Sequence, residues 1–167
     1  MQKDLKVISK AKELSAVIFE ITERSPKKYR FTLVSRMQNI SLDIIAELYE
    51  ANDTYIDMKI ISDMTKTIDH VKNIKEFASE EERIHYQNKL FELKLTKAMK
   101  LEEKVTQRLN HSYGALTGVK KLDYLTVLSA QMQCITPKQQ ERLAKLIYEL
   151  KALIGGFIKS DKQRYNY

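Results

Sequence analysis

The clearest periodicity in the chain lies in residues 27–52, KKYRFTLVSRMQNISLDIIAELYEAN. Its apolar side chains recur every three or four residues, at Leu33, Met37, Ile40, Ile44, Leu48 and Ala51. This spacing places them on one face of an α-helix, as in helices that pack against other helices. We therefore expect a core-facing helix over 27–52.

Three further stretches show the same spacing. They predict helices over 4–23, over about 122–132 and over 137–158. Only a short connection that includes Cys134, Ile135 and Thr136 separates the last two helices, so they must meet in a tight antiparallel turn.

Two pairs, Ser25-Pro26 and Thr136-Pro137, place a hydroxyl residue directly before a proline. A Ser or Thr N-cap followed by Pro in the first helical position is typical of a helix start. Thr136 with Gln139, and Ser79 with Glu82, also have the spacing of a capping box. We therefore predict helix starts at all three places.

Between these helices, residues 56–112 continue the helical spacing and predict a helical hairpin with its turn near Phe77-Ala78-Ser79. Each glycine inside a helix costs about 1 kcal/mol relative to alanine, so Gly114 and Gly118 predict a break or bend within 112–119. The expected fold is all-α: an antiparallel up-down four-helix bundle, lengthened by the hairpin at about 56–112. No Pro/Gly/Ser-rich linker interrupts the chain, which predicts a single domain over 1–167.

Composition supports this class. The 167 residues include only four glycines and two prolines, which argues against a loop-rich sandwich or barrel. The single cysteine, Cys134, excludes an internal disulfide framework and fits a reducing compartment. The N-terminal residues lack an apolar run of signal-peptide length, so we expect a cytoplasmic protein without membrane contact.

Catalytic signatures are absent from the sequence. It contains no glycine-rich phosphate loop, no Gly-x-Ser-x-Gly and no His-Glu-x-x-His. Glu82 and His85 have the spacing used in di-iron bundles, but such sites need a second copy of this motif and further glutamates. Cys134, beside Ile135, fits a small buried hydrophobe better than a nucleophile. We expect no enzyme, no cofactor and no metal.

The chain is basic, with 29 Lys and Arg against 22 Asp and Glu, a net charge of +7. This balance favours polyanionic partners, although many basic proteins bind none. The surplus is C-terminal, where Lys138, Arg142, Lys145 and the segment 159–164 lie outside the apolar stripe and predict a basic ridge. Tyr165 and Tyr167 follow it and either stack on bases or fray.

Basic residues also crowd the start of the helix predicted over 27–52, at Arg24, Lys27, Lys28 and Arg30. Cations are unfavourable at a helix N-terminus, so their placement there suggests an external anion such as phosphate. The alternative is that Glu20, Glu23 or acidic groups of a neighbouring helix neutralise them.

Three segments carry a resemblance to a known family: SPKKYRFTLVSR (25–36) running into IIAELYEAN (44–52), LDYL (122–125) with CITPKQ (134–139), and LIGGFIK (153–159). They resemble a bacterial four-helix-bundle family that includes the accessory variability determinant (Avd) proteins of diversity-generating retroelements and the proteins encoded in intervening sequences of 23S ribosomal RNA genes. The resemblance covers roughly 5–55 and 113–165.

The resemblance implies a basic bundle that assembles as a homo-oligomer, typically a pentamer, and binds a reverse transcriptase together with RNA or DNA. On the matching positions it implies anion contacts by Lys27, Lys28, Arg30, Arg36 and Lys159. Gly155 and Gly156 would then permit close helix approach. The other function that the sequence leaves open is a helical scaffold for protein partners that does not bind nucleic acid.

Overall fold

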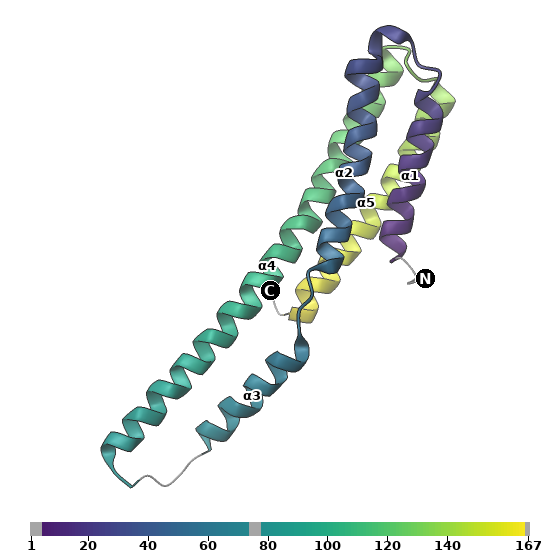
Figure 1. Cartoon of the computed structure of the whole chain (residues 1–167). Helices are drawn as coiled ribbons and strands as arrows, with labels where there is room; N and C mark the ends of the chain where they lie inside the picture. The colour runs from purple at the N-terminus through teal and green to yellow at the C-terminus, as the bar shows by residue number, and fades with distance from the viewer. Residues whose placement is uncertain (1–4, 74–77, 166–167) are drawn as a thin grey trace. The chain divides into compact units, whose positions relative to one another are not determined.

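We describe the protein from a computed structural model, which describes residues 5–73 and 78–165 (Figure 1). Every regular element in those ranges is helical, as predicted. The elements are α1 (Lys6–Thr22), a 3₁₀ turn η1 (Lys27–Tyr29), a π-helical turn η2 (Arg30–Val34), α2 (Ser35–Asp53), α3 (Met58–Lys72), α4 (Glu80–Gln131) and α5 (Pro137–Tyr165).

The chain divides into two compact units. The first, the bundle unit, contains residues 1–53 and 108–167 and so combines α1, α2, α5 and the C-terminal part of α4. The second, the hairpin unit, contains residues 54–107, close to the extension predicted over 56–112. The prediction of a single domain is left open by this division.

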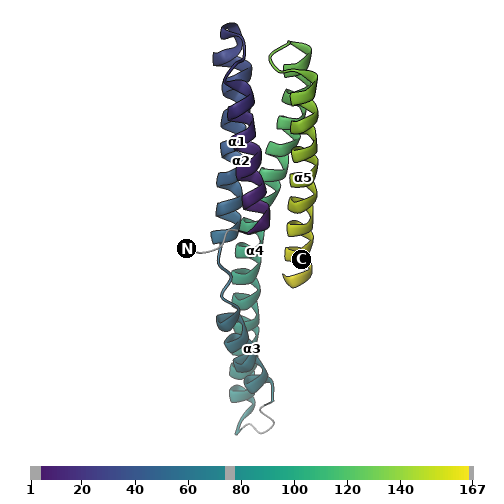
Figure 2. The ribbon, with the colours of Figure 1, turned by 90° about the vertical axis from the view of Figure 1, so that its right-hand side faces the viewer.

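In the bundle unit, α1 packs against both α2 and α5. Figures 1 and 2 show these three helices running alongside the C-terminal part of α4, with the chain reversing between α1 and α2 and between α4 and α5. The predicted stripes supply the core, whose largest fully buried side chains include Ile8, Leu14, Ile18, Met37, Ile44, Leu48, Leu122, Leu143, Ile147, Leu150 and Ile154.

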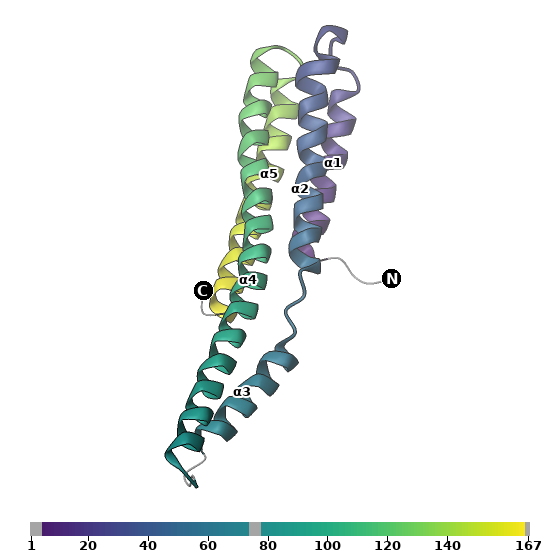
Figure 3. The ribbon, with the colours of Figure 1, turned by 60° about the vertical axis from the view of Figure 1, so that its left-hand side comes forward.

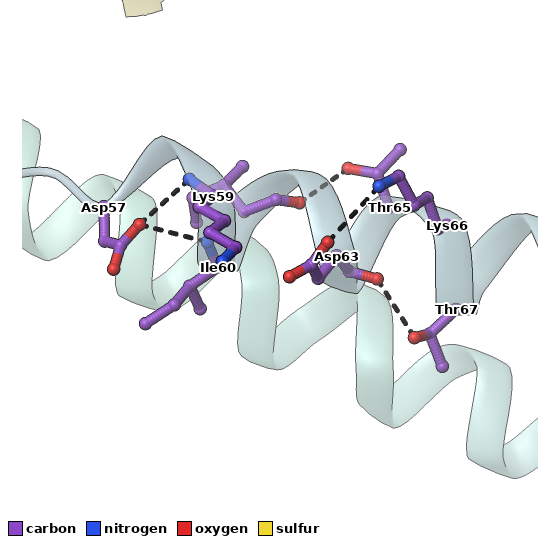
Figure 4. Close-up of polar contacts among 8 residues, drawn as sticks. Asp57, Lys59, Ile60, Asp63, Thr65, Lys66 and Thr67 are labelled. Atoms are coloured by element: carbon purple, nitrogen blue, oxygen red, sulfur yellow. Dashed lines mark hydrogen bonds and ion pairs between the residues drawn. The ribbon is translucent and has the colours of Figure 1, made fainter.

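In the hairpin unit, α3 lies beside the N-terminal part of α4 (Figure 3). Lys97 on α4 donates to the Thr65 hydroxyl on α3 at 2.6 Å. Figure 4 shows the start of α3, where the Asp57 carboxylate accepts from the backbone N–H groups of Lys59 and Ile60 at 2.9 and 3.2 Å. This N-cap was not predicted, although an aspartate before a helix is a typical cap.

Two of the three predicted helix starts are confirmed. The Thr136 hydroxyl accepts from the Gln139 N–H at 3.3 Å, while Gln139 accepts from the Thr136 N–H at 2.8 Å, and α5 begins at Pro137. The Ser79 hydroxyl accepts from the Glu82 N–H at 3.2 Å, directly before α4. The turn predicted near 77–79 lies partly outside the described residues, because Phe77 is not among them.

The helix start predicted at Ser25-Pro26 is wrong in detail. Ser25 is buried and donates its hydroxyl to the Cys134 carbonyl at 3.0 Å, so it does not cap a helix. Pro26 holds the cap position of η1, with no side-chain hydrogen bond, and the α-helix proper begins only at Ser35. A single helix over 27–52 is therefore replaced by a 3₁₀ turn, a π turn and then α2.

The break predicted over 112–119 is also wrong, because α4 runs unbroken from Glu80 to Gln131 (Figure 3). The two glycines instead let α2 approach closely. A Cβ on Gly118 would lie 2.7 Å from Ile44 Cγ1, and one on Gly114 would lie 2.9 Å from Glu47 Cδ. Close packing offsets what each glycine costs the helix.

Among the described residues, a Cβ on Gly155 or Gly156 would meet nothing within 4 Å. The close helix approach that the resemblance implies for these two glycines is therefore not seen in the described part of the chain. The glycines that lie close to a neighbouring helix there are Gly114 and Gly118.

The last helix continues beyond its predicted end at Ile158, to Tyr165. Its extra turns are held by Asp161, which is buried and accepts from Arg108 Nε at 2.7 Å. Arg108 also donates to the Ala51 carbonyl at 2.6 Å, and its guanidinium lies 4.8 Å from the centre of the Phe157 ring. This buried ion pair, which was not predicted from the sequence, joins α4, α5 and the end of α2.

Candidate nucleic-acid interface

Lys27, Lys28 and Arg30 form what we call the basic cluster. They lie on η1 and η2, and all three side chains are exposed. Among the described residues, no carboxylate lies within ion-pair distance of any of them. Three cationic groups on adjacent turns are thus available to an external anion.

The acidic residues expected as alternative partners do not reach the basic cluster. Glu20 instead accepts two hydrogen bonds from Arg142, at 3.0 and 3.2 Å. Glu23 is exposed on the turn that follows α1 and forms no ion pair with the cluster. The internal neutralisation considered from the sequence is therefore not made by these two glutamates.

Aromatic side chains accompany the basic cluster. Phe31, the first residue after Arg30, is 95% exposed, the largest value among the exposed large apolar residues. Lys28 Nζ lies 4.8 Å from the centre of the Tyr29 ring. No role was predicted for Phe31 from the sequence, although an apolar ring within a run of basic residues could have indicated one.

The backbone of this segment is fixed at its base. Besides the Ser25 bond to Cys134, the Tyr29 N–H donates to the Pro26 carbonyl at 3.0 Å. Cys134 is buried, as predicted, and desolvation raises the pKa of its thiol, with a smaller opposing effect of the Lys28 charge. Cys134 thus anchors the segment through its backbone carbonyl, which accepts from the Ser25 hydroxyl.

A hollow of about 700 Å³ adjoins the segment at Pro26. It lies between the end of α1 and the α4–α5 connection, and Arg24, Gln133 and Cys134 are among the residues that line it. Its floor is largely apolar, with Ile21 and Ile135 contributing. Arg24 and Pro26 are thus lining residues that lie next to the basic cluster in the sequence.

The structure brings together part of the predicted basic ridge. Lys138, Arg142 and Lys145 border one open depression on the first turns of α5. Arg142 is engaged by Glu20, whereas Lys138 forms no ion pair within the described ranges. Lys159 is exposed fourteen residues beyond Lys145, a helical rise of about 21 Å. It therefore lies apart from the other three.

Glu149 interacts electrostatically with Lys145 of the basic ridge. Its pKa is lowered, first by a hydrogen bond from Lys10 and then by the charges of Lys10 and Lys145. Lys10 Nζ lies 2.9 Å from Glu149 Oε2, which joins α1 to α5 at the surface. Lys145 is thus partly compensated.

Arg36, the remaining predicted contact, is exposed on the first turn of α2 and borders a groove between α2 and α4 of about 450 Å³. The groove has mixed charge: Lys121 also lines it, as do Asp43 and Glu47. His111 Nδ1 lies 2.8 Å from Glu47 Oε2 there. This surface is less favourable to a polyanion than the basic cluster.

No cluster of three or more metal-ligating side chains occurs in the described residues, and His85 is exposed near the start of α4. In the same ranges, no helix combines the length and the apolar character needed to cross a membrane. Neither the protein-family models nor the curated proteins include a match to this chain.

Proposed function

We propose that this chain is a non-enzymatic accessory protein of a reverse transcriptase of the diversity-generating-retroelement type. In this role it binds RNA or DNA and the polymerase through a basic surface of a homo-oligomer, which the resemblance implies is a pentamer in the cytoplasm. The finer fold that belongs to this proposal is the antiparallel up-down bundle lengthened by an inserted hairpin.

One observation carries the proposal: the basic cluster is exposed and has no carboxylate partner in the described part of the chain. Had the three cations been paired internally, binding of a polyanion would have required those pairs to break. Unpaired surface cations instead gain directly from release of the counterions that surround nucleic acid. Lys138 and the other ridge residues would extend the contact along a phosphate backbone.

The proposal is tested by charge reversal in the basic cluster. Fluorescence anisotropy with a labelled single-stranded oligonucleotide should give an affinity that falls log-linearly with salt. Lys27→Glu with Arg30→Glu should remove most of the binding, and the slope should shrink by about 0.7 for each phosphate that the variant no longer neutralises. Light scattering on the same samples should give a mass several times the 19.6 kDa of one chain.

The matched control is Lys120→Glu with Lys151→Glu, which makes the same charge change at two exposed lysines outside the proposed contacts. Binding should then fall only slightly, through the change in net charge. Equal reductions in the two double variants would refute the site assignment, and a wild-type protein that binds no oligonucleotide at low salt would refute the function itself.

A second candidate function is the scaffold role, which a different observation favours. Ile84, Phe91, Leu95 and Met99 lie on the N-terminal part of α4 at helical spacing, and each is about half exposed or more. Such a strip matches the apolar face of an amphipathic helix of a protein partner. In that case a partner should bind with little dependence on salt, in contrast to the steep dependence expected for nucleic acid.

A further inference from the structure

Phe31 has no packing role in the described structure. At 95% exposure, Phe31 gains almost none of the stabilisation that burial gives a phenylalanine side chain. Single exposed apolar residues are common and by themselves indicate nothing. Phe31 differs because the cations of the basic cluster lie beside it on the same turns and because its own backbone belongs to the π turn η2.

The fold holds the ring outward. Val34, in the same π turn, is buried, which fixes the inner side of this segment. The Ser35 N–H donates to the Arg30 and Thr32 carbonyls, and the Thr32 hydroxyl donates to the Tyr29 carbonyl at 3.3 Å. A ring on such a backbone loses little further freedom when a ligand covers it, so binding energy is not spent on ordering the segment.

The ligand must supply a flat apolar face beside several negative charges. An unpaired nucleotide does so, because its base offers a π face and its neighbours offer phosphates. A continuous duplex keeps its bases stacked on one another and offers mainly phosphates to a surface of this kind. Because the basic cluster is positively charged, a nucleic-acid strand is favoured over an uncharged ligand as the group that covers Phe31.

We propose that Phe31 is a base-stacking residue, and that the surface around it prefers single-stranded RNA or DNA to duplex. This inference rests on the proposed function, since it names the form of nucleic acid bound at the same cluster. Lys27, Lys28 and Arg30 hold the phosphates, while Phe31 stacks on one base. Stacking requires no particular base, so the preference is for unpaired strands and not for a sequence.

Phe31→Ala tests the role directly. Anisotropy with a labelled single strand and with its duplex should show weaker binding of the single strand by about fivefold to 150-fold, the range expected when one base–aromatic stack is removed. Binding of the duplex and the salt slope should both stay as in the wild type, because the phosphate contacts remain. Tyr124→Ala is the matched control, as it removes a 67% exposed aromatic ring elsewhere on the bundle unit.

Phe31→Trp adds a spectroscopic readout. The chain has no tryptophan, so the introduced indole would be its only one. Its fluorescence should be quenched by the single strand, in parallel with the anisotropy change, and should respond little to the duplex. This variant keeps a flat ring and should bind the single strand about as tightly as the wild type does, unlike Phe31→Ala.

The outcomes separate the inference from the proposed function. If Phe31→Ala binds the single strand as the wild type does, the stacking role is refuted while the basic cluster can still bind nucleic acid. If the wild type binds neither probe, both fall together. If Phe31→Ala changes the mass measured by light scattering, the ring belongs to a contact between protein chains, and the stacking role is again refuted.

Discussion

At the scale of single residues, Gln133 shows how α4 ends. It is the one non-glycine residue with positive φ in the described ranges, at 55°. The Cys134 N–H donates to the Ser129 carbonyl at 2.8 Å and the Gln133 N–H to the Ala130 carbonyl at 3.0 Å. This pair of bonds is a Schellman motif with Gln133 in the left-handed position that glycine usually occupies.

Gln133→Gly should therefore stabilise the protein. Glycine adopts the left-handed conformation without the steric cost that a Cβ imposes, and we expect a gain of about 0.5–1 kcal/mol despite its greater freedom in the unfolded chain. Urea unfolding followed by circular dichroism measures the change. Gln133→Ala, which keeps the Cβ, should give no such gain, and equal effects of the two substitutions would contradict the explanation.

The residue scale also shows why only some caps were predictable. Thr136 and Gln139 satisfy each other locally, so their spacing suffices to predict the capping box. Ser25 has the same sequence signature, but its hydroxyl reaches the Cys134 carbonyl 109 residues away. A short motif contains no information about such a distant acceptor.

At the scale of helices, four glycines divide into two kinds that look alike in the sequence. Gly118 lies against Ile44 of α2, whereas a Cβ on Gly155 of α5 would meet no atom of the described residues within 4 Å. Both lie in helix interiors. Helical periodicity gives the face of each helix, but it does not give the distance to the neighbouring helix, which is why the expected break in α4 was wrong.

Alanine at these two positions should have opposite effects. Gly118→Ala would place a methyl group 2.7 Å from Ile44 Cγ1 and should destabilise the protein by about 1–3 kcal/mol through overpacking. The methyl group of Gly155→Ala meets no atom of residues 5–73 and 78–165 within 4 Å, and this variant should stabilise the protein by about 0.5–1 kcal/mol through helix propensity.

Thermal unfolding of the two alanine variants beside the wild type gives both signs in one experiment. A destabilising Gly155→Ala would mean that another chain covers this position. A neutral Gly118→Ala would mean that α2 and α4 are spaced more widely than described.

At the scale of the whole molecule, the two units differ in how much they bury. The bundle unit contains the large core side chains of α1, α2 and α5, whereas the apolar residues buried in the hairpin unit are Ile56, Ile68, Val71 and Val105 among those described. Local stability follows buried apolar contacts, so the hairpin unit should open at a lower free energy.

Hydrogen exchange read by mass spectrometry should show this difference within α4 itself. Amides in 84–100 should exchange at least about tenfold faster than amides in 112–128, although both belong to one hydrogen-bonded helix. Uniform protection along α4 would contradict the difference in stability between the units. The comparison lies within one helix and so needs no separate reference protein.

The candidate site was only partly predictable, because the pairing and exposure of its side chains depend on residues far apart in the sequence. Sequence alone located Lys27, Lys28 and Arg30, because runs of like charge are visible locally. It could not show that Arg142 is engaged, since its partner Glu20 lies 122 residues away. Nor could it show that Phe31 is exposed, because the local pattern does not distinguish a ring that faces the core from one that faces water.

The buried pair of Arg108 and Asp161 limits which substitutions these two positions can accept during evolution. Replacing either residue alone leaves the other charge buried without a partner and lowers the free energy of unfolding by about 3–5 kcal/mol. Replacing both by well-packed apolar residues can leave the stability unchanged. A lineage that replaced the two residues one at a time would therefore pass through a destabilised protein. In any lineage of this protein the two positions, 53 residues apart, should persist or change in concert.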